Sequence, residues 1–257
     1  MERKKYLIVV AGGRGVRMGA DVPKQFLPLG GRAILARTVE RFAEACPGVN
    51  VVTVMNPDFI DRWKQYCLAE EMIVPQRIVE GGITRFHSVQ NALGGIPDGA
   101  VVAVHDGVRP FVSKELIQRM FALSEYYPAL APALPCTDTM RFLSPSGEGS
   151  SEPHLSGAEF EDGSGSGAAS DSEFLIDTLK PADRKSLFRI QTPQVFHFEV
   201  LKKAYSQPYS LDFTDDASVV EASGVKVRYT KGEKFNLKIT EKDDLVISEA
   251  VLKLFKQ

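Results

Sequence analysis

Residues 6–19 read YLIVVAGGRGVRMG, an apolar run that passes directly into a loop of four glycines and two arginines. The short, continuous and β-branched run is typical of a strand buried on both faces of a parallel sheet. Because glycine lacks a Cβ atom, the backbone N–H groups of the loop can approach an anion closely. Lys24 adds a further cation after Pro23. The stretch therefore predicts a first strand followed by a phosphate-binding loop.

Two familiar phosphate-binding motifs do not fit this loop. A dinucleotide-binding turn needs a third glycine where Met18 stands, and an acidic residue at the end of the second strand, where the sequence has Met55 and Asn56. A P-loop needs a Lys-Ser or Lys-Thr pair after its glycines, and none follows here. A triphosphate, with its dense charge, suits the remaining combination of glycines and cations. A tight strand-to-helix turn with solvated cations is the alternative interpretation.

Outward from this stretch, strand-like and helix-like segments alternate, which predicts an α/β fold with a doubly wound, mostly parallel sheet. We expect parallel, buried strands at 6–11, 49–55, 73–79, 101–105 and 129–133. We expect helices at 34–45, 59–70, 85–94 and 114–126, the last with Ser113 as its N-cap. Further along we expect helices at 195–206 and 215–223, strands at 226–230 and 236–239, and a closing helix from about Asp243.

Composition sets limits on the function. The chain has 257 residues, 44% hydrophobic and 25% charged, with a net charge of -2, so nothing in it favours nucleic-acid binding. The three cysteines are scattered and predict neither a disulfide framework nor a zinc site. The apolar run near the N-terminus is too short for a secretory signal, and no segment approaches the length of a membrane span. We therefore expect a cytoplasmic protein.

Residues 144–172 differ from the rest of the chain. They are rich in Ser, Gly and acidic residues and contain neither Lys nor Arg. Such a composition is typical of a flexible, solvated loop, with an acidic regulatory or docking segment as the alternative. Because plausible site residues lie on both sides of the tract, we expect a single domain, 1–257, interrupted by an arm or insertion at about 142–180.

Several motifs then follow in order along the chain. They are AGGRGVRMG (11–19), PKQFLPLGGRAIL (23–35), EGGITRFHSV (80–89), HDGVRPF (105–111), DTM (138–140), QTPQVF (191–196), TDDAS (214–218) and NLKIT (236–240). Together they resemble the sugar- and polyol-phosphate nucleotidyltransferases, and most of all the cytidylyltransferases that act on 2-C-methyl-D-erythritol 4-phosphate. The resemblance implies a Rossmann-like fold with a protruding dimerisation arm. It also implies transfer of CMP from CTP with release of pyrophosphate, a step of non-mevalonate isoprenoid precursor synthesis.

The reaction needs charge neutralisation more than a base, because the acceptor phosphate is already ionised near neutral pH. The resemblance implies Arg17, Lys24 and Lys238 as the catalytic cations. For Lys238, an exposed lysine on an edge strand is the structural alternative. The resemblance further implies that the nucleotide is bound by Ala11, Gly12, Gly13, Gly15, Gly82, Ser88 and Asp106.

The chain departs from the family pattern at two positions. Ile83 and Phe235 stand where relatives often carry an acidic residue, so carboxylate contacts there are absent. His87 we expect on a helix surface, and His105 we expect to be structural.

Asp106 follows a predicted buried strand, at the edge of the sheet where open α/β proteins bind ligands. It is the best-placed carboxylate for Mg²⁺, the expected divalent cofactor. Alternatively it caps the turn or binds substrate hydroxyls. Arg109 suits either the acceptor phosphate or a pairing with Asp106.

Four residues are implied for the polyol phosphate, namely Arg109, Thr139, Arg184 and Thr192. By resemblance, Arg184 and Thr192 belong to an arm that reaches the site of a neighbouring subunit, which implies a homodimer with composite active sites. Asp215 and Asp216 we expect to order the start of a helix rather than to carry out chemistry.

Two other functions remain open at this point. The ribitol 5-phosphate cytidylyltransferases, which make CDP-ribitol, share nearly the same motifs. A non-catalytic nucleotide-binding protein would keep the glycine loop but would have no need of Arg17, Lys24 and Lys238 together.

Overall fold

The computed structural model describes residues 3–13, 22–143 and 179–254. The chain divides into two compact units, one formed by Met1–Leu134 and Ile190–Gln257, the other by Pro135–Arg189. The arm or insertion expected at about 142–180 falls inside the second unit. Among its described residues, that unit contains a two-stranded antiparallel sheet, β8 (Arg141–Leu143) with β9 (Leu179–Pro181), and the short helix η4 (Arg184–Ser186).

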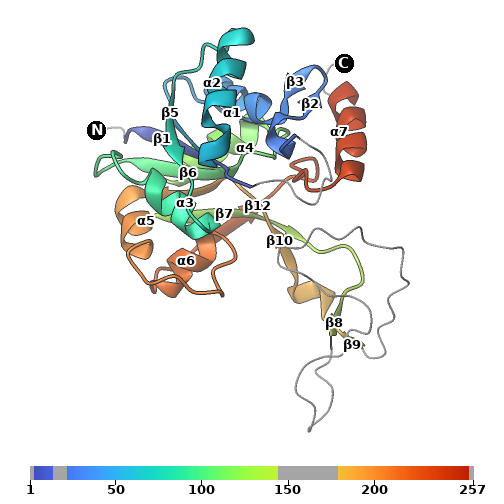
Figure 1. Cartoon of the computed structure of the whole chain (residues 1–257). Helices are drawn as coiled ribbons and strands as arrows, with labels where there is room; N and C mark the ends of the chain where they lie inside the picture. The colour runs from blue at the N-terminus through green and yellow to red at the C-terminus, as the bar shows by residue number, and fades with distance from the viewer. Residues whose placement is uncertain (1–2, 14–21, 144–178, 255–257) are drawn as a thin grey trace. The chain divides into compact units, whose positions relative to one another are not determined.

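The first unit is built on the predicted, mostly parallel sheet (Figure 1). Its order among the described residues is β10-β7-β11-β6-β1-β4-β5, with β12 beside β7. The strands are β1 (Lys5–Ala11), β4 (Asn50–Met55), β5 (Gln76–Glu80), β6 (Val101–Asp106), β7 (Ala129–Pro135), β10 (Phe188–Ile190), β11 (Gln194–His197) and β12 (Arg228–Lys231). The strands β5, β4, β1 and β6 run parallel, whereas β11 is antiparallel to both β6 and β7. The α/β fold class is therefore confirmed.

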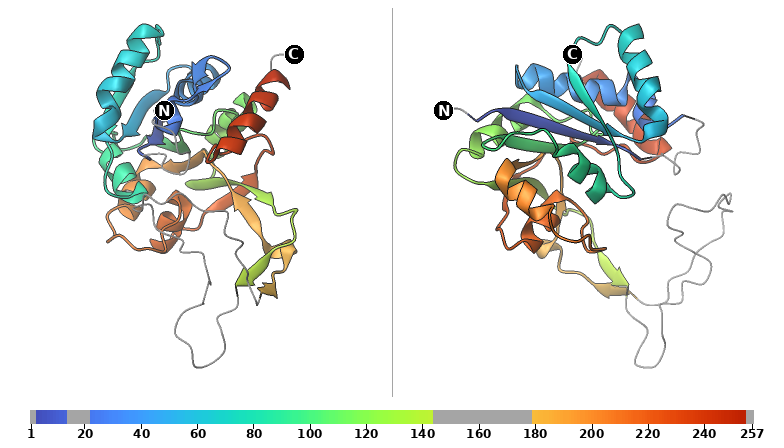
Figure 2. Two further views of the ribbon diagram at one scale, coloured as in Figure 1. Left: turned by 45° about the vertical axis from the view of Figure 1, so that its right-hand side comes forward. Right: turned by 60° about the vertical axis from the view of Figure 1, so that its left-hand side comes forward.

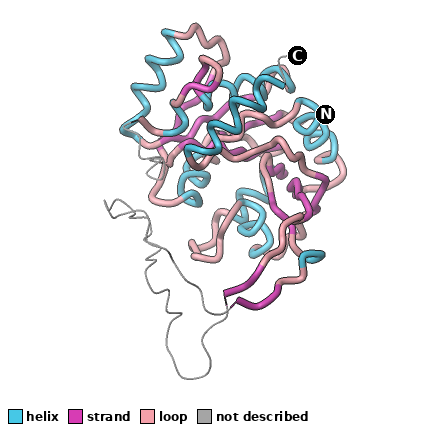
Figure 3. Tube along the Cα trace, turned by 90° about the vertical axis from the view of Figure 1, so that its right-hand side faces the viewer, coloured by secondary structure: helices cyan, strands magenta, loops and turns pink. Residues whose placement is uncertain are grey.

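Helices cover both faces of this sheet, as Figures 2 and 3 show from other directions. The helices α1 (Ile34–Ala45), α2 (Ile60–Ala69) and α4 (Lys114–Leu123) contribute to one apolar core. The helices α3 (Arg85–Ala92), α5 (Phe198–Ala204) and α6 (Asp216–Ala222) contribute to the other. Residues along β1 alternate between these cores, with Leu7 in the first and Ile8 in the second. Burial on both faces explains why its sequence is a continuous apolar run.

Three predicted elements are wrong in detail. Residues 195–206 form a strand and then a helix, because Val195 and Phe196 fill the space between β6 and β7 before α5 begins. Residues 236–239 form no strand, although Ile239 is buried. The strand expected at 73–79 begins only at Gln76, and it is half-buried because it lies at the edge of the sheet. Ser113 caps α4 as predicted, accepting a hydrogen bond from the backbone N–H of Leu116.

The closing helix α7 (Lys242–Leu254) packs on a small hairpin formed by β2 (Pro28–Leu29) and β3 (Arg32–Ala33). A third apolar cluster joins them, including Leu29 and Val251. The hairpin turns through Gly30 and Gly31, whose φ angles of 57° and 81° favour glycine. A Cβ atom on Gly30 would also lie 2.2 Å from the side chain of Leu252. Within the described parts of the chain, no helix combines the length and apolar character needed to cross a membrane.

Asp244 holds the first turn of α7 in place. Its carboxylate accepts hydrogen bonds from the backbone N–H groups of Thr240 (2.7 Å) and Glu241 (3.0 Å) and from the Thr240 hydroxyl (2.7 Å). Partial burial would raise the pKa of Asp244, but these donors and the charge of Lys24 together hold it below its ordinary value. The ionised carboxylate therefore stabilises the folded state above the unfolded pKa of about 3.9, and that stabilisation is lost as the pH falls below it.

Replacing this carboxylate should weaken the helix start. We expect Asp244→Ala to lower the free energy of unfolding by about 1 kcal/mol at pH 7. The difference from the wild type should shrink as the pH falls below about 4, because the wild-type carboxyl group becomes protonated. Urea unfolding at several pH values measures both quantities. The control Asp244→Asn keeps one acceptor oxygen and should show a smaller loss, and an Ala variant whose deficit stays constant with pH would contradict the assignment.

Candidate active site

A pocket of about 370 Å³ lies at the carboxyl ends of β1 and β6, where ligands bind in open α/β sheets. It is lined by segments that are far apart in the sequence: the loop after β1, the turn before α3, the end of β6 and the loop after β12. The predicted residues that meet at its wall are Ala11, Gly12, Gly13, Lys24, Gly82, Ser88, Asp106 and Lys238. Val10, Gln25, Ile83, Thr84, Arg85 and Val108 complete the described lining.

The glycine loop leaves β1 at this pocket. Gln25 lies next to Lys24 in the short helix η2 (Lys24–Phe26), and its side-chain amide donates a hydrogen bond to the carbonyl of Ala11 over 3.0 Å. This bond ties the segment that carries Lys24 to the start of the loop. The loop residues Gly15 and Arg17 lie outside the described residues, so their predicted roles stay predictions.

The turn before α3 is shaped by its own side chains. The Ser88 hydroxyl donates to the carbonyl of Thr84 over 2.9 Å and accepts from the backbone N–H of Gly82 over 3.1 Å. A Cβ atom on Gly82 would lie 2.4 Å from the Cβ of His87, so this position requires glycine. His87 is half-buried, and its Nδ1 lies 2.8 Å from the Thr84 hydroxyl, so it is less exposed than expected. Ser88 therefore maintains the shape of the turn, and its predicted contact with the nucleotide stays a prediction.

Asp106 lies at the centre of the site, with a side chain that is only 10% exposed. Its Oδ2 is 2.9 Å from Nε of Arg109 and 3.4 Å from Nζ of Lys238, and its Oδ1 is 3.7 Å from Nη2 of Arg85. Burial would raise the pKa of Asp106, but these three cations hold it far below its usual range. Asp106 is therefore a permanent negative charge that binds three positive ones. Lys238 lies in no strand, so the edge-strand alternative is wrong.

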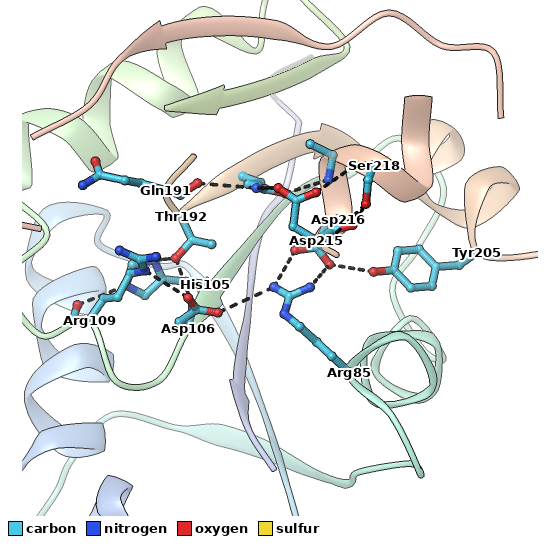
Figure 4. Close-up of polar contacts among 12 residues, drawn as sticks. Arg85, His105, Asp106, Arg109, Gln191, Thr192, Tyr205, Asp215, Asp216 and Ser218 are labelled. Atoms are coloured by element: carbon cyan, nitrogen blue, oxygen red, sulfur yellow. Dashed lines mark hydrogen bonds and ion pairs between the residues drawn. The ribbon is translucent and has the colours of Figure 1, made fainter. Parts of the chain in front are cut away.

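Arg85 is a site residue that the sequence analysis did not select. At the first position of α3, it lines the pocket and forms two hydrogen bonds, 2.8 and 2.7 Å long, with the carboxylate of Asp216 (Figure 4). Asp216 has no exposed side-chain surface and also accepts a hydrogen bond from the Tyr205 hydroxyl over 2.6 Å. Burial and the neighbouring Asp216 raise the pKa of Tyr205, so its hydroxyl stays a donor. The sequence contained both partners in motifs, but nothing in it paired residues 131 positions apart.

The two aspartates of TDDAS have different roles. Asp215 caps α6 through a reciprocal pair of hydrogen bonds with Ser218, which confirms that it orders the start of the helix. Asp216 does more than that, because it holds the guanidinium of Arg85 at the wall of the pocket.

His105 and Thr192 are buried together behind Asp106. Burial lowers the pKa of His105 to about 4, so the ring is neutral near pH 7. Its Nδ1 lies 2.9 Å from the hydroxyl of Thr192, which also accepts the backbone N–H of Asp106 over 3.1 Å. The expectation that Thr192 belongs to an arm is wrong, because it is 5% exposed within the first unit. Its sequence position beside the insertion was misleading.

The other two residues expected at the acceptor phosphate belong to the second unit. Thr139 and Arg184 are exposed, and a guanidinium nitrogen of Arg184 donates to the carbonyl of Thr137 over 3.1 Å. Arg109 lies in the first unit, where it pairs with Asp106 and donates to the carbonyl of Asn236 over 3.0 Å. Of the two roles expected for Arg109, the pairing with Asp106 is the one present.

The described residues do not form a resident metal site. Nowhere in residues 3–13, 22–143 and 179–254 do three or more His, Cys, Asp or Glu side chains gather as metal ligands. Asp106 is a single carboxylate, and cations of the protein already contact both of its oxygens. A divalent cation usually takes one or two carboxylates together with phosphate oxygens and water. These residues therefore do not fit a metal held by the protein alone.

A doubly wound α/β fold with a cation-lined pocket at the carboxyl ends of its parallel strands is typical of proteins that bind nucleotide phosphates, the nucleotidyltransferases among them. A family profile described as 2-C-methyl-D-erythritol 4-phosphate cytidylyltransferase matches residues 6–148 and 169–254. The chain belongs to this family. Between its two matched parts the profile leaves out residues 149–168, which lie within the Ser/Gly-rich tract.

Individual relatives agree with the family match. The 2-C-methyl-D-erythritol 4-phosphate cytidylyltransferase of Bacteroides thetaiotaomicron is 41% identical over 249 residues, which cover 97% of this chain and 100% of that protein. The protein of the same name from Porphyromonas gingivalis W83 is 40% identical over 254 residues, covering 98% and 99%. The crystal structure of the Thermus thermophilus protein of that name has a TM-score of 0.66 at 27% identity, covering 97% of this chain and 99% of that one.

The ion pair between Arg85 and Asp216 predicts a large effect on stability. We expect Arg85→Ala to lower the free energy of unfolding by about 3 kcal/mol, because it leaves the carboxylate of Asp216 buried without its cation. Arg85→Lys keeps the charge but cannot form both hydrogen bonds, so it should lose less. Urea unfolding followed by circular dichroism measures both variants. Equal and small losses in the two would mean that the pair contributes little.

Proposed function

We propose that this protein transfers CMP from CTP to 2-C-methyl-D-erythritol 4-phosphate and releases pyrophosphate. Family membership supports the reaction. The relatives above are named for this activity, and they match nearly the whole of this chain. The observation that carries the proposal is the charge of the pocket. Its described lining has three cations, Lys24, Arg85 and Lys238, against the single carboxylate of Asp106, and a triphosphate is the ligand that such an excess suits. The relatives reported above are named for 2-C-methyl-D-erythritol 4-phosphate as the acceptor, and not for ribitol 5-phosphate.

The chemistry follows from this charge. An oxygen of the acceptor phosphate attacks the α-phosphorus of CTP, the new P–O bond forms, and the bond to the β-phosphate oxygen breaks, so pyrophosphate leaves with the electron pair. The nucleophile is already ionised near neutral pH, which removes the need for a general base. Catalysis then depends on holding the reactants in line and on neutralising the charge of the transition state. In this proposal Lys24, Lys238 and Arg17 neutralise that charge.

The geometry around Asp106 suggests how Lys238 reaches the phosphate. Its ion pair with Asp106 is long, at 3.4 Å, and the lysine side chain is 44% exposed. Because Lys238 is partly exposed and Arg85 and Arg109 also contact the buried carboxylate, Lys238 can exchange Asp106 for a phosphate oxygen without leaving that carboxylate unpaired. Arg109 is 12% exposed and only 2.9 Å from the same carboxylate, and so it stays with Asp106. Asp106, with its charge still balanced, is then free to accept hydrogen bonds from substrate hydroxyl groups.

The acceptor site is proposed to be composite. Arg109, while it stays paired with Asp106 through Nε, would offer another guanidinium N–H to the acceptor phosphate from one subunit, and Thr139 and Arg184, which are exposed in the second unit, would bind it from another. Thr192 would act from behind Asp106. This part of the proposal requires a homodimer. We further propose a cytoplasmic location, which the three scattered cysteines favour.

The proposal includes Mg²⁺ as a companion of the triphosphate rather than as a resident of the protein. The described residues do not hold a metal by themselves, so the ion would be bound mainly by phosphate oxygens. When bound, it would neutralise part of the phosphate charge. Calorimetric titration with Mg²⁺ should therefore show binding only in the presence of CTP.

The direct test of function uses the purified protein with CTP and Mg²⁺ and measures pyrophosphate release with each polyol phosphate in turn. We expect release with 2-C-methyl-D-erythritol 4-phosphate and little with ribitol 5-phosphate. Release with the ribitol compound only would overturn the choice of acceptor. If neither acceptor supports release, the proposed enzymatic activity is wrong.

The two described catalytic lysines give a sharper test. We expect Lys24→Ala and Lys238→Ala each to lower kcat about 10²-fold, the scale for loss of one donor to the transition state. Lys234 provides a matched control, because it is exposed and is not among the residues that line the pocket. Lys234→Ala should keep the wild-type kcat in the same assay. Near-wild-type turnover in both catalytic variants would mean that Lys24 and Lys238 are solvated surface charges with no part in catalysis.

A further inference from the structure

The side chain of His105 contributes to holding both ends of one tight turn, which runs from Asp106 to Arg109. The turn is closed by a hydrogen bond from the backbone N–H of Arg109 to the carbonyl of Asp106 over 3.1 Å. His105 comes just before it, at the end of β6, with no exposed surface and with its ring 4.8 Å from that of Phe42. Nε2 of the ring lies 3.1 Å from the carbonyl oxygen of Arg109, and Nδ1 lies 2.9 Å from the Thr192 hydroxyl.

The polarity of these contacts follows from their chemistry. A carbonyl oxygen can only accept, so Nε2 of His105 must carry the proton that it donates to Arg109. In the neutral ring Nδ1 is then an acceptor, and it accepts a hydrogen bond from the Thr192 hydroxyl. That leaves the oxygen of Thr192 to accept the backbone N–H of Asp106. Every donor in the chain from Asp106 through Thr192 to His105 therefore has an acceptor.

This chain of hydrogen bonds fixes both ends of the turn. The N–H of Asp106 is held through Thr192, and the carbonyl of Arg109 is held directly by His105 (Figure 4). The middle of the turn is confined as well. A Cβ atom on Gly107 would lie 3.0 Å from the side chain of Leu35, and the carbonyl of Val108 accepts the backbone N–H of Ile239 over 2.9 Å. Through this bond the turn also holds Ile239, the residue that follows Lys238.

The side chains at the two ends of this turn carry charges of the site. The carboxylate of Asp106 contacts three cations, and the guanidinium of Arg109 is one of them. Rotation or displacement of the turn would move both groups. It would also change the position of Lys238 relative to the phosphate. A misplacement of about 1 Å can reduce a rate about 10²-fold.

We infer that His105 is a positioning residue for the transfer reaction: as a neutral ring protonated at Nε2, it acts with Thr192 to set the placement of Asp106 and Arg109. It is not among the described residues that line the pocket, and in the proposed reaction it does not touch the substrates. A buried histidine whose hydrogen bonds are merely satisfied would stabilise the fold without setting the rate. The inference rests on the proposed cytidylyl transfer for its kinetic readout only.

Two substitutions of His105 separate its hydrogen bond to Thr192 from its hydrogen bond to Arg109. In His105→Gln, the side-chain nitrogen can still reach the carbonyl of Arg109, but the acceptor for Thr192 is lost. In His105→Asn, the side-chain oxygen can still accept from Thr192, but the bond to Arg109 is lost. We expect each to lower kcat about 10-fold or more under conditions where circular dichroism shows a folded protein. Thr192→Val should have a similar effect, and Thr192→Ser, which keeps the hydroxyl, should restore most of the rate.

A double-mutant cycle distinguishes positioning from general destabilisation. Thr192→Val removes both hydrogen bonds of the hydroxyl, including the one that His105→Gln removes, so the double variant should lose little more kcat than Thr192→Val alone. His105→Asn removes the bond to Arg109, which Thr192→Val leaves in place, so the effects of these two on kcat should be closer to multiplicative. The matched control is His197→Asn, which by the same geometry as His105→Asn loses a hydrogen bond between a ring Nε2 and a backbone carbonyl, here the 2.8 Å contact with Ser124, outside the pocket lining. It should lower stability and leave kcat unchanged.

A spectroscopic measurement on the wild-type protein needs no activity and no folded variant. Nitrogen-15 NMR of the imidazole should show His105 protonated at Nε2 and unprotonated at Nδ1 at pH 7. The opposite tautomer would overturn the inference, as would kcat within about twofold of wild type in His105→Gln, His105→Asn and Thr192→Val. If the wild-type enzyme is inactive with both polyol phosphates, the proposed function fails, whereas the NMR result still decides the hydrogen-bond chain.

Discussion

The site depends on one buried carboxylate that is bound to three cations. Asp106 brings together Arg85 from α3, Arg109 from its own turn and Lys238 from the loop after β12. In the absence of a ligand, three cations this close would repel one another, and a single ionised carboxylate at their centre reduces that repulsion. Because the three come from separate segments, the same contacts also help to fix how those segments meet.

The rest of the site supports this carboxylate from two sides. On one side Asp216, itself fully buried, fixes the guanidinium of Arg85 through two hydrogen bonds. On the other side Thr192 and His105 fix the backbone of the turn. Both supports come from the layer behind the pocket, so the groups that face the ligand are held by groups that do not. Such support keeps charged side chains in position before the substrate binds, which is how electrostatic catalysis avoids reorganisation.

Local patterns predicted well those features that depend on neighbouring residues in the chain. The helix α1 has the expected limits, and the capping residues Ser113 and Asp215 and the first parallel strands lie where their sequences indicate. Features that depend on distant partners were missed. Arg85 and Asp216 are 131 residues apart. The strand β11 exists because β6 and β7 leave room for it, and a run of only four residues carries no periodicity that could tell strand from helix. Thr192 was assigned to the arm by resemblance, whereas its burial depends on His105 and Asp106, which are 87 and 86 residues away in the sequence.

The departures from the family pattern reinforce the electrostatic argument. Ile83 lines the pocket and is 95% exposed at its rim, at a position where relatives often carry an acidic residue. An additional carboxylate there would cancel one of the two excess positive charges of the described lining. With Ile83, the wall of the pocket keeps that excess, and the backbone of the turn around Gly82 lies next to it in the lining. The requirement for glycine at that position, imposed by the close approach of His87, keeps that backbone in place.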